Sequence, residues 1–350
     1  MNTIDGTLAE VRAIAEKLVG GMVAVQHLQP RGRNSRIYRI DCGQQTYALK
    51  QYPSRSVDAR DRLGTEVGAL QLMERSRVDV VPRVVGVDRD RGCALLTWID
   101  GAEIAELTKV DIEAAVHFIS AIHALRKTPW ASEQPIAAEA CLSGREIERQ
   151  LGERLSRLLS LPLKEWVEHD LAAFLENCFM PVRDRLLAKA KSDMTAAELD
   201  FAAELPQERR SLSPSDFGFH NSLRRPDGSL AFVDFEYFGW DDPVKLIADV
   251  TLHPGWPLTD DQRRCFLLLT LPVYQSDSKF AARFRALFPL FGLRWVLIVL
   301  NEFLPERWER RVLAGHTGLW REAKLRQLAR AKNLLATLPR RLENESCNSG

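Results

Sequence analysis

Three side chains in one short stretch carry oxygen atoms suited to metal and proton chemistry: Asp216, Asn221 and Asp234. Residues 226–229, Pro-Asp-Gly-Ser, are a strong turn signal, and residues 230–235 fit an alternating strand, so the sequence predicts a hairpin between Asn221 and Asp234. Such a hairpin would fold Asp234 back beside the loop that carries Asp216. Two carboxylates and one amide oxygen would then lie close together. Oxygen ligands of this kind suit Mg²⁺, which completes its shell with phosphate oxygens and water.

These residues also have an ordinary structural interpretation. An isolated Asp and Asn at this spacing is a weak signal that occurs by chance in many proteins. Asp216 could cap a helix, and Asp234 could close a strand. The elements that would have to position these side chains therefore decide between the two interpretations.

The sequence of the first third of the chain predicts a small β-sheet that carries another polar side chain, Lys50. Strands are expected at residues 23–28, 36–41 and 46–52, with a loop at residues 30–35 between the first two. This loop could lay backbone N–H groups over phosphates, although such a loop is more often a hairpin turn. Lys50 lies on the third strand, where a lysine is usually a solvated edge residue.

A helix is predicted to follow this sheet at residues 56–75. Its apolar stripe contains Leu63, Val67 and Leu70. Glu66 borders that stripe and can therefore point inward. A carboxylate that faces the sheet could pair with Lys50 and hold it in place, whereas Glu66 would otherwise be a surface charge.

Two more predicted strands, residues 84–88 and 93–99, complete a five-stranded antiparallel sheet with one helix. The chain then leaves the sheet through Trp98 and Ile99, and Trp98 could serve only as a packing residue. From residue 108 onward the sequence is mainly helical in its periodicity.

The order of these pieces resembles the aminoglycoside phosphotransferase and choline kinase family, which are small-molecule relatives of the protein kinases. Asp216 and Asn221, followed by Asp-Phe-Glu at residues 234–236, are similar to the family's catalytic and metal segments. Gly-Trp-Asp-Asp-Pro at residues 239–243 is similar to its G-x-x-D-P run. The resemblance covers roughly residues 20–300, and the order of its pieces is more specific than any one of them.

The resemblance implies an α+β, two-lobed protein kinase-like fold. Residues 1–100 would form the N-terminal ATP-binding lobe, with an N-terminal helix, a five-stranded antiparallel sheet and one further helix. Residues 101–342 would form a mostly helical C-terminal lobe with the catalytic loop and the acceptor site. Residues 343–350 are expected to be a disordered tail.

Catalytic and nucleotide-binding roles follow from the resemblance residue by residue. Asp216 would be the catalytic base that accepts the proton of the substrate hydroxyl, and Asn221 and Asp234 would hold Mg²⁺ on ATP. Lys50 would contact the α- and β-phosphates of ATP, with Glu66 as its partner. The other expected ATP contacts are Asn34 and Ser35 in the loop and Trp98 and Ile99 at the hinge.

The resemblance also implies that the acceptor is an alcohol group on a small molecule. The segment after Asp-Phe-Glu lacks the A-P-E motif and the long activation loop of protein kinases, which argues against a protein substrate. Members of the family phosphorylate sugars, aminoglycosides, amino alcohols and nucleoside-like alcohols, so the family name does not identify the substrate.

One departure from the family pattern leaves a second hypothesis open. The family usually has His-Gly before the catalytic aspartate, where this chain has Pro214 and Ser215. His220 cannot be assumed to replace the missing histidine. The alternative is therefore a pseudokinase, a nucleotide-binding or scaffold module without turnover. The chain nevertheless keeps the main polar residues of the pattern, which are Lys50, Asp216, Asn221 and Asp234.

Composition and charge exclude several other classes of protein. The chain has 350 residues, 45% of them hydrophobic, which is enough for a large buried core. Its net charge is +1, so no global electrostatic attraction favours a nucleic acid or a membrane surface as partner. The six cysteines are scattered without a C-x-x-C pair, as in a reduced cytosolic protein.

Two segments bear on the location of the protein. The longest apolar runs, residues 266–274 and 290–300, are expected to be too short to span a bilayer, and the second contains Arg294. The N-terminal residues predict an amphipathic helix and not a signal peptide. The sequence therefore predicts a soluble cytoplasmic protein. The basic stretch at residues 305–342 favours a long helix with a solvated basic face.

Overall fold

The computed structural model describes residues 8–28, 35–55, 58–313 and 318–346. Contacts between residues divide the chain into two compact units. Unit 1 contains Met1–Ala138 and Leu212–Trp240, and unit 2 contains Glu139–Ser211 and Asp241–Gly350. The division groups the predicted catalytic loop with the N-terminal sheet. The predicted lobe boundary after residue 100 stays a prediction.

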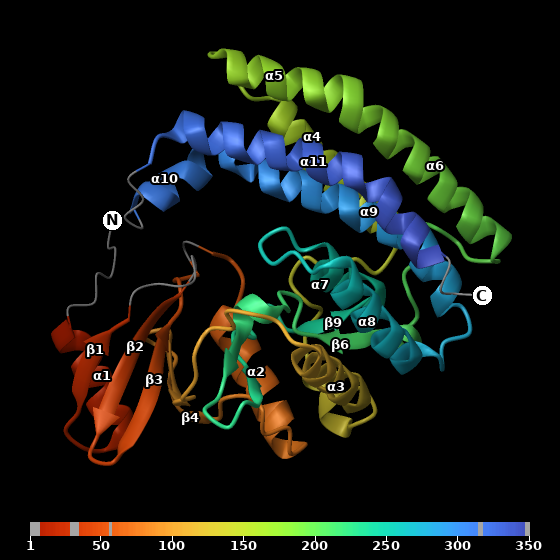
Figure 1. Cartoon of the computed structure of the whole chain (residues 1–350). Coiled ribbons are helices and arrows are strands. Elements are labelled where there is room, and N and C mark those ends of the chain that lie inside the picture. Colours follow the sequence, from red (N-terminus) through yellow and green to blue (C-terminus); the bar gives the residue numbers. More distant parts are fainter. Residues whose placement is uncertain (1–7, 29–34, 56–57, 314–317, 347–350) are drawn as a thin grey trace. The chain divides into compact units, whose positions relative to one another are not determined.

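Unit 1 contains the predicted five-stranded antiparallel sheet, which is confirmed (Figure 1). Its strands are β1 (Ala24–His27), β2 (Arg36–Cys42), β3 (Gln45–Gln51), β4 (Val84–Asp88) and β5 (Cys93–Thr97). The strand order is β1-β2-β3-β5-β4, with antiparallel pairing throughout. Gly43 and Gly92 have positive φ angles at the two tight turns of this sheet, where glycine adopts the required conformation without steric cost. Strand β5 ends two residues earlier than predicted, so Trp98 and Ile99 follow the strand.

Helix α1 (Leu8–Val19) packs on one face of this sheet. It buries Val11 and Ile14 in a cluster with Ile40, Leu49 and Leu95 from three neighbouring strands. Removing this apolar surface from water stabilises the face of β3 that lies opposite to its polar side chains.

Helix α2 (Arg62–Arg75) begins six residues later than predicted. The side chain of Asp61 accepts a hydrogen bond from the backbone N–H of Gly64 at 3.0 Å, which caps the helix at this point. The helix buries Glu66 together with the apolar stripe that the sequence predicts. The face of α2 that carries Glu66 is therefore packed inside unit 1.

Helix α3 (Lys109–Leu125) supports two loops through one aromatic cluster. The ring centroid of Phe118 lies 5.6 Å from that of Phe217, 4.4 Å from that of Phe232 and 6.0 Å from that of Phe235. Phe217 follows Asp216 in the chain, and Phe235 follows Asp234. Packing of the phenylalanines on α3 therefore fixes the positions of both loops.

The predicted hairpin is present, but it is shorter than the sequence suggests. Strand β7 (Ser222–Arg224) pairs with β8 (Leu230–Phe232), and β8 is buried on both faces. Asp234 is therefore not the last member of an alternating strand. It has a φ of 71°, in the left-handed region, and the preceding Val233 donates its N–H to the carbonyl of Asn221 at 3.0 Å. This bond places Asn221 beside the start of the Asp-Phe-Glu segment.

Short elements complete unit 1 and its junctions with unit 2. They are the 3₁₀ helices η1 (Pro129–Glu133) and η4 (Phe219–Asn221) and the strands β6 (Ser211–Ser213) and β9 (Gly239–Asp241). Strands β6 and β9 lie where the chain passes from one unit to the other.

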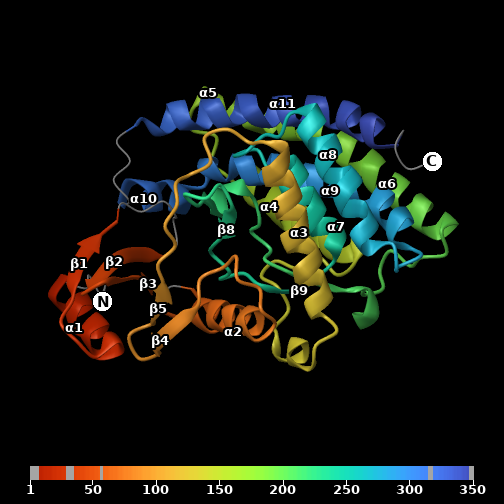
Figure 2. The ribbon, with the colours of Figure 1, turned by 60° about the horizontal axis from the view of Figure 1, so that its bottom comes forward.

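Unit 2 is helical, as the sequence predicts. Its α-helices are α4 (Gly144–Leu159), α5 (Trp166–Phe174), α6 (Met180–Ala196), α7 (Pro243–Leu252), α8 (Asp260–Thr270), α9 (Phe280–Val299), α10 (Pro305–Leu313) and α11 (Trp320–Ser346). Its shorter elements are the π-helix η2 (Leu175–Phe179) and the 3₁₀ helices η3 (Gln207–Arg209), η5 (Leu271–Tyr274) and η6 (Leu300–Phe303). Helix α9 packs against α4, α6, α7 and α11 (Figure 2).

Helix α9 is longer than its apolar run predicts. With η6 it forms one helical segment, Phe280–Phe303, which is long and apolar enough to cross a membrane by length and composition. The expectation that this run is too short was therefore wrong. Within unit 2, however, 78% of its apolar window is buried, and Arg294 pairs with Asp249 at 3.5 Å. This burial is typical of the core helix of a globular unit.

The C-terminal helix also differs from the prediction. Helix α11 continues through Ser346, so residues 343–346 are helical although they were expected to be disordered. Residues 347–350 lie outside the described residues. The helix buries Leu328, Leu335 and Leu338, which lie on its predicted apolar side.

Unit 2 contains a buried cluster of charges near the start of α7. Lys245 is 1% exposed, and its ammonium nitrogen lies 3.2 Å from Asp241 and 3.1 Å from Asp249. Burial alone would lower the pKa of Lys245, but the carboxylates of Asp249 and Asp241 outweigh it and raise the pKa above its ordinary value. Lys245 is therefore charged at neutral pH and holds two buried carboxylates.

We predict that Lys245→Met lowers the free energy of unfolding by about 3–5 kcal/mol, because buried Asp241 loses its counter-ion and buried Asp249 keeps only Arg294. Urea unfolding at pH 7, followed by far-ultraviolet circular dichroism, measures this loss. The matched control is Lys189→Met, since Lys189 is exposed and pairs with Asp193 on the helix surface. It should cost no more than about 0.5 kcal/mol. Equal losses in the two variants would contradict the structural role of Lys245.

Candidate active site

The candidate site is built around the ammonium group of Lys50. This side chain is 6% exposed, and its nitrogen lies 2.6 Å from Glu66, 2.7 Å from Asp234 and 3.6 Å from Glu236. All four residues belong to unit 1. The predicted Lys50–Glu66 pair is thus present, and one buried cation lies among three carboxylates from two other segments of the chain.

Strand β3 and helix α2 position this pair. Lys50 lies in the centre of the sheet, opposite Ile37 of β2 and Ala94 of β5. Burial opposes the charged form of Lys50, but the carboxylates of Glu66, Asp234 and Glu236 outweigh it and raise the pKa of Lys50 above its ordinary value. The group is therefore a permanent cation at physiological pH.

Glu66 also holds the Asp-Phe-Glu segment. One of its oxygens accepts hydrogen bonds from Lys50 at 2.6 Å and from the hydroxyl of Tyr52 at 2.8 Å. The other accepts a hydrogen bond from the backbone N–H of Phe235 at 3.2 Å. Both oxygens are thus engaged, and Glu66 joins strand β3 to the backbone beside Asp234.

Glu236 is a part of the site that sequence reasoning missed. It is 3% exposed. In addition to its ion pair with Lys50, it accepts a hydrogen bond from the hydroxyl of Ser35 at 2.9 Å. Its second oxygen pairs with Arg62 on the first turn of α2. Glu236 therefore connects the end of the predicted phosphate loop, the strand lysine and the helix.

Arg62 completes this network and was also missed. Its guanidinium donates to Asp58 at 2.8 Å and to the hydroxyl of Tyr237 at 2.9 Å. The only sequence signal for Glu236 was its place in the Asp-Phe-Glu motif. Arg62 has no such signal, because its partner Glu236 lies 174 positions away in the chain.

The predicted catalytic loop presents the side chain of Asp216 toward solvent. The side chain of Asp216 is 49% exposed, and one of its oxygens lies 3.3 Å from Nε2 of His220. The side-chain amide of Asn221 donates to the backbone carbonyl of Asp216 at 2.8 Å. The two predicted residues are therefore held together, and the turn η4 carries both His220 and Asn221.

Hydrogen bonds hold the segment that departs from the family pattern. Ser215 has a φ of 65°, a left-handed conformation that costs a residue other than glycine about 1–2 kcal/mol. Its backbone N–H donates to the hydroxyl of Ser213 at 3.1 Å, and its own hydroxyl donates to the carbonyl of Ala138 at 3.0 Å. The family's usual glycine falls at this position, where glycine needs no such support.

The remaining predicted ATP contacts are Asn34, Ser35, Trp98 and Ile99. Ser35 joins the cluster through Glu236, whereas Asn34 lies outside the described residues. Trp98 and Ile99 are half-buried after β5. The indole N–H of Trp98 donates to Asp100 at 2.8 Å. Contact of Trp98 and Ile99 with adenine stays a prediction.

The donor atoms of Asp234 and Asn221 fit a magnesium ion. One carboxylate oxygen of Asp234 pairs with the ammonium group of Lys50. The Asp234 side chain is 35% exposed, so its second oxygen is accessible to a metal ion. Because the amide nitrogen of Asn221 is bonded to Asp216, its oxygen is the atom left to act as a ligand. Glu66 and Glu236 do not fit this role, since their side chains are 1% exposed and their oxygens are already engaged.

An antiparallel sheet with a buried Lys–Glu pair, followed by an Asp-x₄-Asn loop and an Asp-Phe-Glu segment, places the protein in the kinase-like class of α+β folds. The chain belongs to the phosphotransferase enzyme family, whose sequence model matches residues 27–259. A search of curated proteins found no match.

Solved structures show the same fold at low sequence identity. A spectinomycin phosphotransferase in complex with ADP and spectinomycin is 10% identical, with a TM-score of 0.59 over 96% of this chain and 98% of that one. A choline kinase from Streptococcus pneumoniae is 15% identical, with a TM-score of 0.56 over 94% and 99%. A Plasmodium vivax ethanolamine kinase is 11% identical, with a TM-score of 0.55 over 90% and 84%. This likeness confirms the predicted fold class.

We predict that two substitutions of Ser215 differ in their effect on stability. Ser215→Ala loses the hydrogen bond to Ala138 and keeps the left-handed strain, so it should lower the free energy of unfolding by about 1–2 kcal/mol. Ser215→Gly loses the same bond but relieves the strain, so its net effect should be less than about 1 kcal/mol. Urea unfolding of both variants measures the difference. If the glycine variant were the less stable of the two, the left-handed conformation would not hold in solution.

Proposed function

We propose that the protein is an ATP- and Mg²⁺-dependent kinase that transfers the γ-phosphate to a hydroxyl group of a small molecule. The observation that carries the proposal is the cluster of Lys50, Glu66 and Asp234 in the same unit as the Asp216–Asn221 loop. Membership of the phosphotransferase family supports it. The ADP in the complex of the spectinomycin phosphotransferase supports an adenine nucleotide as the donor.

Lys50 would bind the phosphates of the nucleotide. Its raised pKa keeps the ammonium charged, and Glu66 and Glu236 hold it in place from the buried side. Asp234 is the one partly exposed carboxylate of the three. It can therefore exchange its ion pair with Lys50 for a bond to another cation with little desolvation free energy. The ammonium group would then be available to phosphate oxygens.

Asp216 would act on the acceptor. Its exposed carboxylate accepts the proton of the acceptor hydroxyl while the hydroxyl oxygen forms a bond to the γ-phosphorus. The bond from this phosphorus to the bridging oxygen of ATP breaks, and ADP leaves. His220 and the Asn221 amide hold the loop, and the carboxylate with it, in one orientation. Positioning of this kind accounts for much of phosphoryl-transfer catalysis.

Asp234 and Asn221 would hold Mg²⁺ through one carboxylate and one amide oxygen. When it is bound, the ion supplies neutralisation of the charge that develops on the phosphate oxygens. Asp234 is fixed from the protein side by Lys50 and by the Phe235 backbone bond to Glu66. The two ligands therefore start from defined positions before the ion arrives.

We propose that the protein works in the cytoplasm. Its proposed acceptor is a sugar, an amino alcohol, an aminoglycoside-like compound or a nucleoside-like compound. The similar structures include a spectinomycin phosphotransferase, a choline kinase and an ethanolamine kinase, all of which fit this class. The second candidate is a nucleotide-binding module without turnover, suggested by Pro214 and Ser215. The hydrogen bonds of Ser213 and Ser215 support an ordered loop and so favour turnover.

The first test is ADP release from Mg·ATP across a panel of sugars, aminoglycosides, amino alcohols and nucleosides. We expect one class of compound to stimulate release. The matched control, Asp216→Asn, should lower turnover about 10²–10⁴-fold and leave ATP affinity nearly unchanged, because it removes the base without changing the shape of the loop. Undiminished turnover in this variant would remove Asp216 from its role. Binding of ATP without release in the whole panel would favour the module without turnover.

We predict that Asp234→Asn abolishes the Mg²⁺ dependence of ATP binding, since the change removes the charged ligand of the ion. Isothermal calorimetry with ATP, with and without Mg²⁺, measures this effect. Asp227→Asn is the control, because Asp227 is an exposed turn residue of the hairpin and lies outside the ion cluster. Tight Mg·ATP binding by the Asp234 variant would contradict the assignment of Asp234 as a Mg²⁺ ligand.

A further inference from the structure

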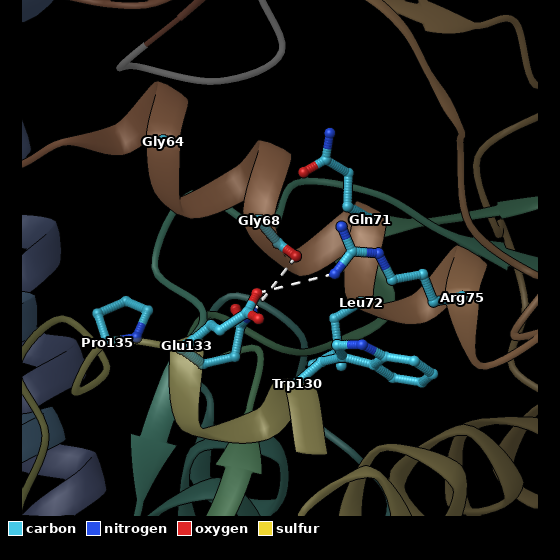
Figure 3. Close-up of a pocket in the computed structure, with 9 residues that line it drawn as sticks. Gly64, Gly68, Gln71, Leu72, Arg75, Trp130, Glu133 and Pro135 are labelled. Atoms are coloured by element: carbon cyan, nitrogen blue, oxygen red, sulfur yellow. Dashed lines mark hydrogen bonds and ion pairs between the residues drawn. The ribbon is translucent and has the colours of Figure 1, made fainter. Parts of the chain in front are cut away.

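A cavity lies in unit 1 on the side of helix α2 that faces away from Glu66. Its volume is about 110 Å³, and its walls include Gly64, Gly68, Arg75, Trp130, Glu133 and Gln134 (Figure 3). The helix residues are spaced at three and four positions, so they share one face of α2. Glu66 lies two positions from both glycines, about 200° around the helix. The cavity is therefore separate from the Lys50 cluster, although one helix borders both.

The inner wall of this cavity holds a polar atom without a partner. Gln134 is 9% exposed, and its side-chain oxygen has no hydrogen-bond partner in the described part of the chain. Its amide nitrogen reaches the carbonyl of Gly68 at 3.5 Å, which is the outer limit of a hydrogen bond. A buried acceptor that stays unpaired costs free energy, so a ligand that donates an N–H to it would bind favourably.

The guanidinium group of Arg75 occupies the outer part of the cavity, and its contacts there are long. A guanidinium nitrogen of Arg75 lies 3.8 Å from a carboxylate oxygen of Glu133, and the guanidinium carbon lies 6.0 Å from the ring centroid of Trp130. Both distances are near the limits of an ion pair and of a cation–π contact. The side chains of Arg75 and Glu133 are 49% and 63% exposed, so Arg75 can move into solvent at little cost. Figure 3 shows the guanidinium of Arg75 directed toward the carboxylate of Glu133, with the ring of Trp130 beside Arg75.

We propose that this cavity binds a small organic cation that carries N–H donors, an ammonium or guanidinium compound. Glu133 pairs with its charge, and the face of Trp130 lies alongside it. The oxygen of Gln134 and the carbonyl of Gly68 accept its hydrogen bonds. The unpartnered polar atom of the wall is an acceptor, and the acidic side chain of the wall is Glu133, which favours a cation over an anion as the ligand. Arg75 occupies the outer position until the ligand displaces it.

Such a ligand acts on the helix that orients Lys50. Gln134 lies against α2 at Gly68, since a β-carbon at this position would be in ordinary van der Waals contact with the Gln134 oxygen, at 3.7 Å. In this proposal an occupant of the cavity lies against the face of α2 opposite Glu66, and its effect reaches the Lys50–Glu66 contact through the helix. The bound cation is thereby an effector of nucleotide binding, a consequence that rests on the proposed function.

The binding site is tested with methylguanidinium chloride as the probe and neutral N-methylurea, which has nearly the same shape, as its counterpart. A saturation-transfer NMR titration should show saturable binding of the cation at millimolar concentration and at least tenfold weaker binding of the urea. Arg75→Ala should tighten binding about three- to tenfold, because it removes the competing cation. Glu133→Gln should weaken it by a similar factor. Glu74→Gln, an exposed acid of the same helix outside the cavity, should change nothing.

Equal binding of the two probes, or equal binding in the Glu133→Gln and Glu74→Gln variants, would overturn the site. The effector role is measured separately, as the ATP affinity with and without saturating methylguanidinium. We expect at least a threefold change that is lost in Glu133→Gln, and an unchanged affinity would overturn the effector role. If the protein bound no ATP at all, the proposed function would fail, while the NMR titration would still decide the cation site.

Discussion

The buried charge of Lys50 is the constraint on which the rest of unit 1 depends. A buried ammonium is tolerated only when carboxylates and hydrogen bonds replace its water. Glu66 and Glu236 do so from the buried side, and Asp234 from the exposed side. Arg62 pairs with both Glu236 and Asp58, and Asp58 also pairs with Arg60. The network therefore has three cations against four carboxylates, so one negative charge is in excess. That excess lies at Asp234, where a carboxylate oxygen is accessible, and it is there that a divalent cation is expected.

Apolar packing sets the geometry of the polar residues around this charge. Asp216 and Asp234 are each followed by a buried phenylalanine, Phe217 and Phe235, and both rings pack on Phe118 of helix α3. The two carboxylates are thus one residue away from a common aromatic cluster. A small shift of that cluster would move both loops at once. The core of unit 1 and its candidate chemistry therefore share the same constraints, although the rings themselves take no part in proton transfer.

Local patterns in the sequence predicted the helices and strands. Contacts between residues far apart in the chain determined the conformation of Asp234 and the Arg62–Glu236 pair. The strands, the α2 stripe and the Lys50–Glu66 pair follow from periodicity and from the family resemblance. The left-handed conformation of Asp234 does not, because alternation in residues 230–235 cannot distinguish a half-buried strand from one that is buried on both faces. The Arg62–Glu236 pair was missed for a related reason. It joins residues far apart in the chain, and no local spacing marks them as partners.

The candidate machinery for phosphoryl transfer lies entirely within unit 1, from Lys50 on β3 to Glu236 after the hairpin. The distances between its side chains are therefore fixed by one sheet, two helices and one hairpin. Unit 2 is stabilised by a core of its own, with α9 packed among four helices and Lys245 buried between two carboxylates. The residues that would activate the nucleotide and the helical core thus belong to different units. Kinases of different small molecules share this fold at identities of 10–15%, so the fold is kept although most of the sequence differs.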